Sequence, residues 1–199
     1  KSLNDVSIKI QHGKSIGIIG KSGSGKTTLI DLLLGLLDPG KGEILYNNKH
    51  ISNNQLDLLN GRVAYIPQQV FLLDDSLMSN ISLNNKNDSN LSQVLEAVKQ
   101  ARLLELISRL PNGLDTKIGE SGVRVSGGER QRIALARALY YDRDVIIMDE
   151  ATSALDSDTE SEIINEINNL KASKTLIVIA HRLSTLQNCD IIYKLENGK

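Results

Sequence analysis

Cysteine is almost absent from the sequence, with one residue, Cys189, in 199 positions. A single thiol cannot close an internal bridge, so a small secreted scaffold held by disulfides is excluded. Cys189 stands just before the apolar pair Ile191 and Ile192, which favours a buried small hydrophobic residue over a reactive thiol. The chain must therefore rely on an ordinary hydrophobic core, and it suits a reducing compartment.

An excess of charge is also missing, since 23 lysines and arginines stand against 24 aspartates and glutamates. This balance gives no reason to expect nucleic acid as a partner. Long apolar runs are missing too: VIIM before Asp149 and TLIVIA before His181 have the length of a strand and are far too short to span a bilayer. We therefore expect a domain that neither crosses a membrane nor binds nucleic acid.

The most informative segment that is present is GKSGSGKTT, which follows the apolar run SIGIIG. It matches the phosphate-binding pattern G-x-x-x-x-G-K-[ST] at Gly20, Gly25, Lys26 and Thr27. Glycines let the backbone bring its N–H groups against polyphosphate oxygens, and the following helix adds the positive end of its dipole. Lys26 would then bridge the β- and γ-phosphates, and Thr27 would offer its hydroxyl to Mg²⁺. A simple Gly/Ser turn is the alternative, but four specified positions between a strand and a helix favour a nucleotide.

Apolar runs predict strands elsewhere in the chain, at residues 6–10, 15–19, 43–46, 63–66, 145–148, 175–179 and 191–195. Residues 72–142 contain no convincing strand. Instead, helical periodicity places on one face the residues Val94, Ala97, Val98, Ala101 and Leu104. Asn90 with Gln93 fits the start of that helix. The pattern predicts an α/β core, residues 1–70 and 143–199, with a helical insertion at residues 71–142.

A second chemical signal is VIIMDE, in which a buried strand ends in Asp149 and Glu150. The carboxyl ends of parallel strands are where ligands of α/β sheets bind. Asp149 would hold Mg²⁺ together with Thr27, and Glu150 would polarise the attacking water as general base. Taken alone, the pair could be two solvated acids at the end of a strand.

A third signal is SGGERQR, residues 126–132. Ser126 followed by Glu129 fits a capping box at the start of a helix through IALARAL. A capped helix that begins with Gly127 and Gly128 also exposes backbone N–H groups suited to a phosphate. Both interpretations can hold together.

Six motifs along the chain resemble, in kind and in order, those of the nucleotide-binding domain of an ATP-binding cassette (ABC) transporter. The resemblance covers essentially all of the 199 residues. Three are the segments above, which correspond to Walker A, Walker B and the signature. The others are the Q-loop glutamine, Gln68 in AYIPQQ, the D-loop SALD with Ser153 and Asp156, and the switch histidine, His181 in IVIAHR. On its own, His181 would be interpreted as an ordinary histidine at the end of a strand.

The resemblance implies an α/β fold, a RecA-like P-loop NTPase core with an antiparallel β subdomain and an α-helical insertion subdomain. It implies Mg²⁺-dependent hydrolysis of ATP with Glu150, His181 and Gln68 as catalytic residues. Thr27, Gln68 and Asp149 would surround the metal. Nucleotide binding is assigned to Gly20, Ser22, Gly23, Ser24, Gly25, Lys26, Thr27 and Thr28. The signature residues Ser126, Gly127, Gly128 and Glu129 would act on the nucleotide of a partner, with the D-loop beside them.

The sequence departs from the family pattern in two small ways and in one larger one. Val125 stands where leucine is usual, and Glu129 where glutamine is frequent. No aromatic residue precedes Tyr46, so the side chain that stacks on adenine in this family would lie before residue 1. The strand-like start of the chain and its turn-like end, ENGK, likewise predict that it is part of a longer polypeptide.

The family mechanism implies a second nucleotide-binding domain paired head to tail and a transmembrane domain placed N-terminally in the same chain. The pair could be a homodimer or a heterodimer, and a homodimer is predicted to contain two complete sites because this chain carries both halves of the site. Two segments resemble the corresponding segments of exporters: TKIGESG, residues 116–122, and FLLDDSLMSNI, residues 71–81. The resemblance implies that Phe71 and Glu120 lie at the contact with the membrane domain. Taken alone, Glu120 could be merely an acid in a turn. The segment formed by Leu73 and the two aspartates after it resembles the same segment of exporters that flip lipid-linked oligosaccharides. The expected location is the cytoplasmic face of the cell membrane.

Other classes share some of these motifs. A soluble ABC ATPase of DNA repair or translation, the alternative function, would need a long coiled-coil insertion or a second cassette, and this span has neither. A nucleotide sensor without activity would tolerate the loss of Glu150 or His181, yet both are present. A small-molecule kinase shares only the Walker A motif. The sequence therefore favours an ATPase that powers export.

Overall fold

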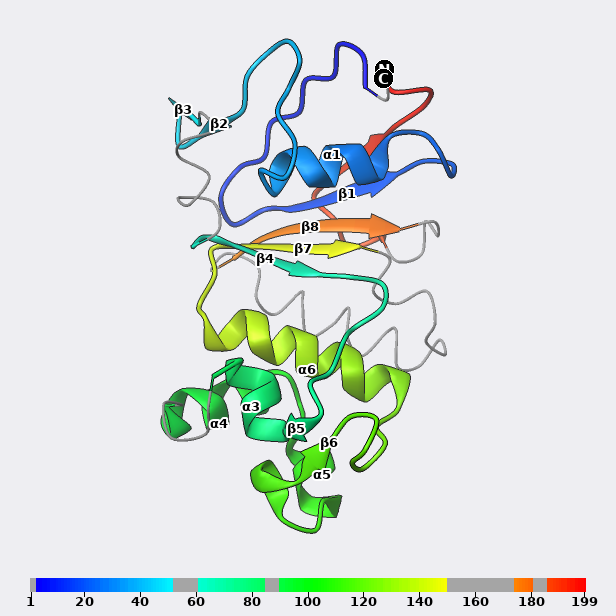
Figure 1. Cartoon of the computed structure of the whole chain (residues 1–199). Helices are drawn as coiled ribbons and strands as arrows, with labels where there is room; N and C mark the ends of the chain where they lie inside the picture. Colours follow the sequence, from blue (N-terminus) through cyan, green and yellow to red (C-terminus); the bar gives the residue numbers. More distant parts are fainter. Residues whose placement is uncertain (1–2, 52–60, 85–89, 150–173, 181–185) are drawn as a thin grey trace. The chain divides into compact units, whose positions relative to one another are not determined.

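The structure is a computed structural model, and it describes residues 3–51, 61–84, 90–149, 174–180 and 186–199. These residues fall into two compact units, which Figure 1 shows in the colours of the sequence. The first unit is formed by the described residues within Lys1–Tyr65, Arg143–Glu150 and Leu170–Lys199, and the second by those within Ile66–Asp142.

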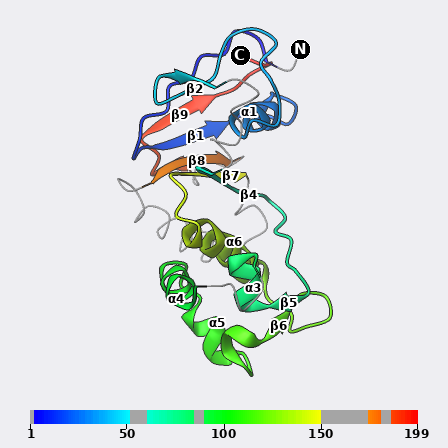
Figure 2. The same cartoon turned by 60° about the vertical axis from the view of Figure 1, so that its left-hand side comes forward.

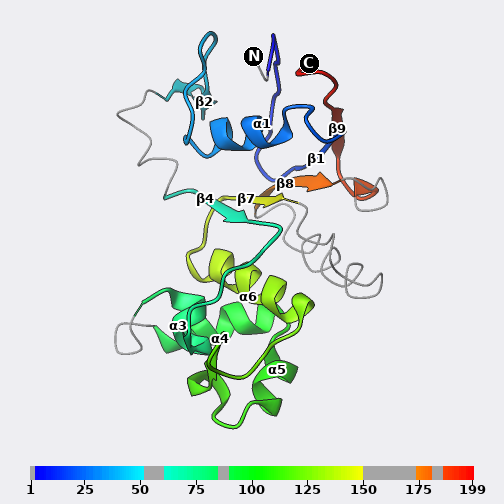
Figure 3. The same cartoon turned by 45° about the vertical axis from the view of Figure 1, so that its right-hand side comes forward.

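The first unit is built on a five-stranded sheet in the order β4-β7-β8-β1-β9. Its strands are β1 (Ser15–Ile19), β4 (Val63–Ile66), β7 (Val145–Asp149), β8 (Thr175–Ala180) and β9 (Ile191–Lys194). β1 pairs in parallel with β8 and with β9, and β7 pairs in parallel with β8. In Figures 1 and 3, β4, β7, β8 and β1 point the same way. The α/β class predicted for the chain is therefore confirmed.

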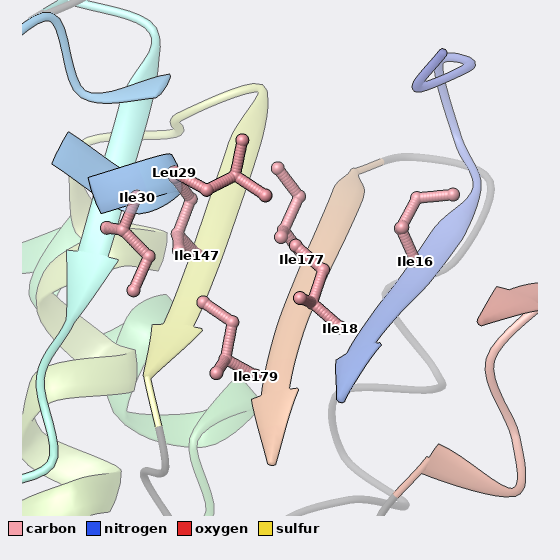
Figure 4. Close-up of a cluster of buried hydrophobic side chains, with 7 residues drawn as sticks. All are labelled: Ile16, Ile18, Leu29, Ile30, Ile147, Ile177 and Ile179. Carbon is pink, nitrogen blue, oxygen red and sulfur yellow. The ribbon is translucent and has the colours of Figure 1, made fainter. Parts of the chain in front are cut away.

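Isoleucine side chains from three strands form the core of this unit together with helix α1 (Lys26–Leu33). Figure 4 shows the cluster, which consists of Ile16, Ile18, Leu29, Ile30, Ile147, Ile177 and Ile179. β-Branched side chains suit strands buried on a face, and burying each one contributes roughly 1.5–3 kcal/mol. This packing fixes α1, and with it the loop between β1 and α1, against the sheet.

Gly17 lies between two buried isoleucines of β1, so its position faces the other side of the sheet. A Cβ atom there would lie 3.1 Å from Leu186 Cδ2 and 3.3 Å from Cys189 Sγ. The close approach of Leu186 explains why the smallest residue occurs in the middle of a strand. Cys189 packs here but is half-buried, whereas the sequence predicted a buried residue.

A small antiparallel hairpin of β2 (Leu45–Tyr46) and β3 (Lys49–His50) also belongs to the first unit. Its turn residues, Asn47 and Asn48, both have positive φ angles, 51° and 60°, as a tight hairpin turn requires. Residues 6–10, predicted as a strand, form none. Ile8 and Ile10 still pack against the isoleucine core. The alternation of apolar and polar residues therefore reflects burial of these side chains, although the segment forms no strand.

Helices dominate the second unit: α3 (Leu77–Ser82), α4 (Leu91–Gln100), α5 (Leu104–Arg109), α6 (Gly127–Tyr140) and the short 3₁₀-helix η3 (Gly113–Asp115). α6 packs against both α3 and α4, as Figure 2 shows. Two short strands, β5 (Asp75–Ser76) and β6 (Lys117–Ile118), pair antiparallel. The prediction of no strand in residues 72–142 was wrong, because two-residue strands leave no periodic signal.

The predicted apolar face of α4 is correct for most of its length. Asn90 caps the helix by accepting from the N–H groups of Ser92 and Gln93, which confirms the expected start. The face ends early, however, because Arg102 has a φ of 49° and leaves the helical conformation. Leu103 is consequently buried, whereas Leu104 is 54% exposed.

Within the described part of the chain, no helix combines the length and the apolar character needed to cross a membrane.

Candidate functional site

The loop between β1 and α1 has the backbone that its glycines predict. Gly23 and Gly25 have φ angles of 77° and 106°, in the left-handed region that favours glycine. The Ser24 N–H closes a turn by donating to the Lys21 carbonyl at 3.1 Å. Gly25 has no side chain to cap α1, so the first N–H groups of the helix are not capped from that position. These are the groups that bind phosphate in a loop of this kind.

Lys26 places a positive charge inside this loop. Its Nζ donates to the carbonyl of Gly20 at 2.8 Å and to that of Lys21 at 3.2 Å. The residue is only 8% exposed, which is unusual for lysine and is balanced by these two acceptors. The ammonium is therefore held among loop carbonyls, in the position from which it can bind a polyphosphate.

The loop is also fixed from outside by residues near position 198. Gly198 donates its N–H to the Ser24 carbonyl at 3.1 Å, and Leu195 donates to the Ile19 carbonyl at 2.8 Å. A Cβ atom on Gly20 would lie 2.5 Å from both the Leu195 carbonyl oxygen and Ser24 Oγ, so only glycine fits there. The sequence gives no signal for these contacts, because they join segments far apart in the chain.

Asp149 ends β7 at the same edge of the sheet as the loop. β1, β8 and β7 are parallel neighbours, so their carboxyl ends share one edge, and this confirms that the sheet brings the loop and Asp149 to one side. The hydroxyl of Tyr65 in β4 donates to Asp149 Oδ2 at 2.9 Å. Burial raises the pKa of Tyr65, and the hydrogen bond to Asp149 and the charge of Asp149 raise it further. Sequence reasoning missed Tyr65, although it stands three residues before Gln68 at the end of a strand.

The residue types at this edge fit Mg²⁺. Mg²⁺ in phosphate-transfer sites is held by one or two protein oxygens together with substrate phosphates, not by an all-protein cage. Thr27 is exposed at the start of α1, and Asp149 supplies a half-buried carboxylate. Among the residues that the structure describes, no group of three or more His, Cys, Asp or Glu side chains could hold a metal alone. The two oxygen donors, Thr27 and Asp149, suit a metal that also binds substrate phosphates.

The signature segment forms the capping box that the sequence predicts. Ser126 Oγ accepts from the Glu129 N–H at 3.2 Å, and Glu129 Oε2 accepts from the Ser126 N–H at 2.7 Å. Glu129 also forms an ion pair with Arg109. Ser126 and Gly127 are exposed, and Gly128 is half-buried. The start of α6 thus presents a capped, glycine-lined helix N-terminus to solvent.

Gln68 belongs to the second unit, where α6 holds the segment that follows it. Gln131 donates to the Gln68 carbonyl at 3.1 Å. Arg137 donates to the Asn80 carbonyl at 2.6 Å, to Asn80 Oδ1 at 3.1 Å and to the Phe71 carbonyl at 2.9 Å. Burial lowers the pKa of the Arg137 guanidinium. The helix that begins with the signature therefore also anchors residues 68–80.

Four predicted site residues, Glu150, Ser153, Asp156 and His181, lie outside the described residues. Of the predicted residues that the structure describes, the Walker A loop and Asp149 lie in the first unit, and Gln68 and the signature lie in the second.

Comparison with known proteins agrees with this geometry. Residues 3–153 match the family described as ABC transporter. The chain is 44% identical over 197 residues to an ATP-dependent lipid A-core flippase of Alkalilimnicola ehrlichii, covering 99% of this chain and 33% of the relative. A protein of the same description from Haemophilus influenzae is 42% identical over 198 residues, covering 100% of this chain and 34% of the relative. The chain thus spans about a third of the length of the curated relatives it matches.

Among solved structures, a bacterial Atm1-family ABC exporter with ATP bound superposes with a TM-score of 0.88 and 37% identity, covering 98% of this chain and 34% of that chain. The parallel sheet, the phosphate-binding loop and Asp149 at its edge define a P-loop NTPase of the RecA-like class. The family match over residues 3–153 goes further, and the chain belongs to the ABC transporter family, as a nucleotide-binding domain of exporter type. The resemblance predicted from the six motifs is confirmed.

Proposed function

We propose that the chain binds and hydrolyses ATP with Mg²⁺ and that this reaction powers export by an ABC transporter. The observation that carries the proposal is the Lys26 ammonium, held by two loop carbonyls at the sheet edge that also bears Asp149. The loop residues, from Gly20 to Thr28, would bind the phosphates through backbone N–H groups and the Lys26 charge.

Each catalytic residue has a separate part in the proposed reaction. Glu150 acts as general base on the attacking water, and His181 and Gln68 complete the site. Thr27, Gln68 and Asp149 would hold Mg²⁺, which supplies charge neutralisation on the β- and γ-phosphates. The rest of the catalysis is positioning: the rigid loop and the strand ends hold the reacting groups in place.

The exposed start of α6 supports a head-to-tail dimer. A capped helix N-terminus with Gly127 and Gly128 in its first turn suits binding of the terminal phosphate of a nucleotide. Ser126, with Ser153 and Asp156 of the D-loop, would reach the nucleotide of the partner domain. Because one chain carries both halves of the site, a homodimer would contain two complete sites.

A transmembrane domain is the second proposed partner, and it would place this domain at the cytoplasmic face of the membrane. Phe71 is 75% exposed, and an exposed aromatic side chain suits an anchor in a docking contact. Glu120 lies in the same unit and is also exposed. Since two relatives are described as lipid A-core flippases, we propose an amphipathic lipid as the substrate. The comparisons do not favour a soluble ATPase of DNA repair or translation.

ATP hydrolysis at increasing protein concentration, with and without Mg²⁺, tests the proposed function. Specific activity should rise with concentration, because the active form is a dimer, and it should disappear in Glu150→Gln, which should still bind ATP. The matched control is Glu105→Gln, an exposed acid in α5, which should behave like the unchanged protein. Activity that is independent of concentration and survives in Glu150→Gln would reject both the dimer and the base.

A further inference from the structure

Asp149 has a hydrogen-bond donor to which none of the six motifs assigns a role. The Tyr65 hydroxyl donates to Asp149 Oδ2 at 2.9 Å. The two residues belong to β4 and β7, which are neighbours in the sheet, and Figures 1 and 3 show both strands ending at the same side. The contact therefore joins two neighbouring strands of the first unit near their carboxyl ends.

This contact restricts the orientation of the Asp149 carboxylate. The terminal torsion of an aspartate is broad, so the side chain alone does not fix the plane of its two oxygens. A donor mounted on an adjacent strand does fix it, because a strand holds a side chain more rigidly than a loop does.

We propose, on the basis of the function proposed above, that Tyr65 is a positioning residue that holds the Asp149 carboxylate for Mg²⁺. Carboxylates that bind metals are themselves held by hydrogen bonds, and removing such a partner lowers metal affinity about 10- to 100-fold. Tyr65 does not touch the nucleotide in this scheme. It sets how strongly Mg²⁺ strengthens nucleotide binding, and it leaves binding without the metal unchanged.

A second tyrosine–aspartate contact lies next to the start of β7 and serves as an internal control. The Tyr46 hydroxyl donates to Asp144 Oδ2 at 3.3 Å, and Asp144 also pairs with Arg62 at 2.9 Å. Asp144 immediately precedes β7, so this contact lies at the opposite end of the strand from Asp149. Tyr46→Phe and Tyr65→Phe therefore each remove one tyrosine hydroxyl that donates to an aspartate at one end of β7. Only Tyr65→Phe changes the proposed metal site.

The experiment measures the gain in nucleotide affinity that Mg²⁺ provides. Calorimetric titration with a non-hydrolysable ATP analogue, once in EDTA and once in Mg²⁺, gives this gain as a ratio of dissociation constants. Tyr65→Phe should bind the analogue normally in EDTA, and the gain in affinity that Mg²⁺ provides should be about tenfold smaller than in the unchanged protein. Tyr46→Phe should match the unchanged protein in both titrations. Hydrolysis by Tyr65→Phe should require more Mg²⁺ for half-maximal rate, with a smaller effect at saturating Mg²⁺.

A double-mutant cycle separates positioning from a general structural effect. In a protein that already carries Asp149→Ala, Tyr65→Phe should produce no further change, because the group that it positions is gone. An unchanged or larger gain in Tyr65→Phe, or an additional loss in the Asp149→Ala background, would overturn the proposal and leave the proposed ATPase function intact. Absence of any Mg²⁺-dependent gain in the unchanged protein would overturn both.

Discussion

At the scale of single residues, Asp190 shows how one carboxylate joins strands that are distant in sequence. Asp190 Oδ2 accepts from the Ser15 N–H at 2.8 Å and from the Ser15 hydroxyl at 2.9 Å. The Lys14 ammonium lies 3.3 Å from Oδ1. The Ser15 backbone bond, then its hydroxyl, and then Lys14 lower the pKa of Asp190 to about 2. The carboxylate thus connects the start of β1 to the segment that leads into β9.

This shift predicts a loss of stability in acid. Because the folded pKa is below the unfolded value, the contribution of Asp190 is present above about pH 4 and is lost as the pH falls toward 2. Asp190→Asn should lower the free energy of unfolding by about 1 kcal/mol at pH 7, and the difference should shrink below pH 4. Urea unfolding at several pH values measures this. A difference that is constant from pH 7 to pH 2.5 would contradict it.

At the scale of elements, two capped helices allow the structural and the proposed chemical parts of the signature to be separated. Asn90 caps α4 and Ser126 caps α6. Asn90→Ala and Ser126→Ala should each reduce stability by about 1 kcal/mol. Only Ser126→Ala should also reduce ATP hydrolysis, by about tenfold, because its hydroxyl would bind the nucleotide of the partner. Thermal unfolding and ATPase rates measure both effects, and equal losses of activity in the two variants would assign Ser126 to capping alone.

The elements also show how far the sequence predicts this fold. Local signals succeeded where the cause is local: the cap at Asn90, the capping box at Ser126 and the strand at residues 15–19 all depend on neighbouring residues. They failed at residues 6–10, where alternation marked burial without a ladder, and at Leu104, where a positive φ at Arg102 ends the helical face. The contact of Tyr65 with Asp149 could not be predicted, because it depends on which strands become neighbours.

At the scale of the whole molecule, a head-to-tail dimer predicts that two inactive variants restore each other. Lys26→Ala removes the phosphate-binding charge, and Ser126→Arg blocks the signature; each alone should abolish hydrolysis in a homodimer. In a mixed dimer, one site combines both changes and the other has neither. An equal mixture should therefore regain roughly a quarter of the normal ATPase rate, because random pairing makes half of the dimers mixed. An inactive mixture would contradict a site shared between two chains.

The ties around Gly198 have a practical consequence. Gly198 donates its N–H to the Ser24 carbonyl, and the Asn4 N–H donates to the Gly198 carbonyl at 2.7 Å. Residues near position 4 and near position 198 therefore meet at the loop between β1 and α1. After replacement of the lone thiol Cys189 by serine, the substitution Asn197→Cys would provide one attachment point for a fluorophore. The fluorophore would lie beside that loop without occupying it. Optical signals from such a probe would follow nucleotide arrival in real time.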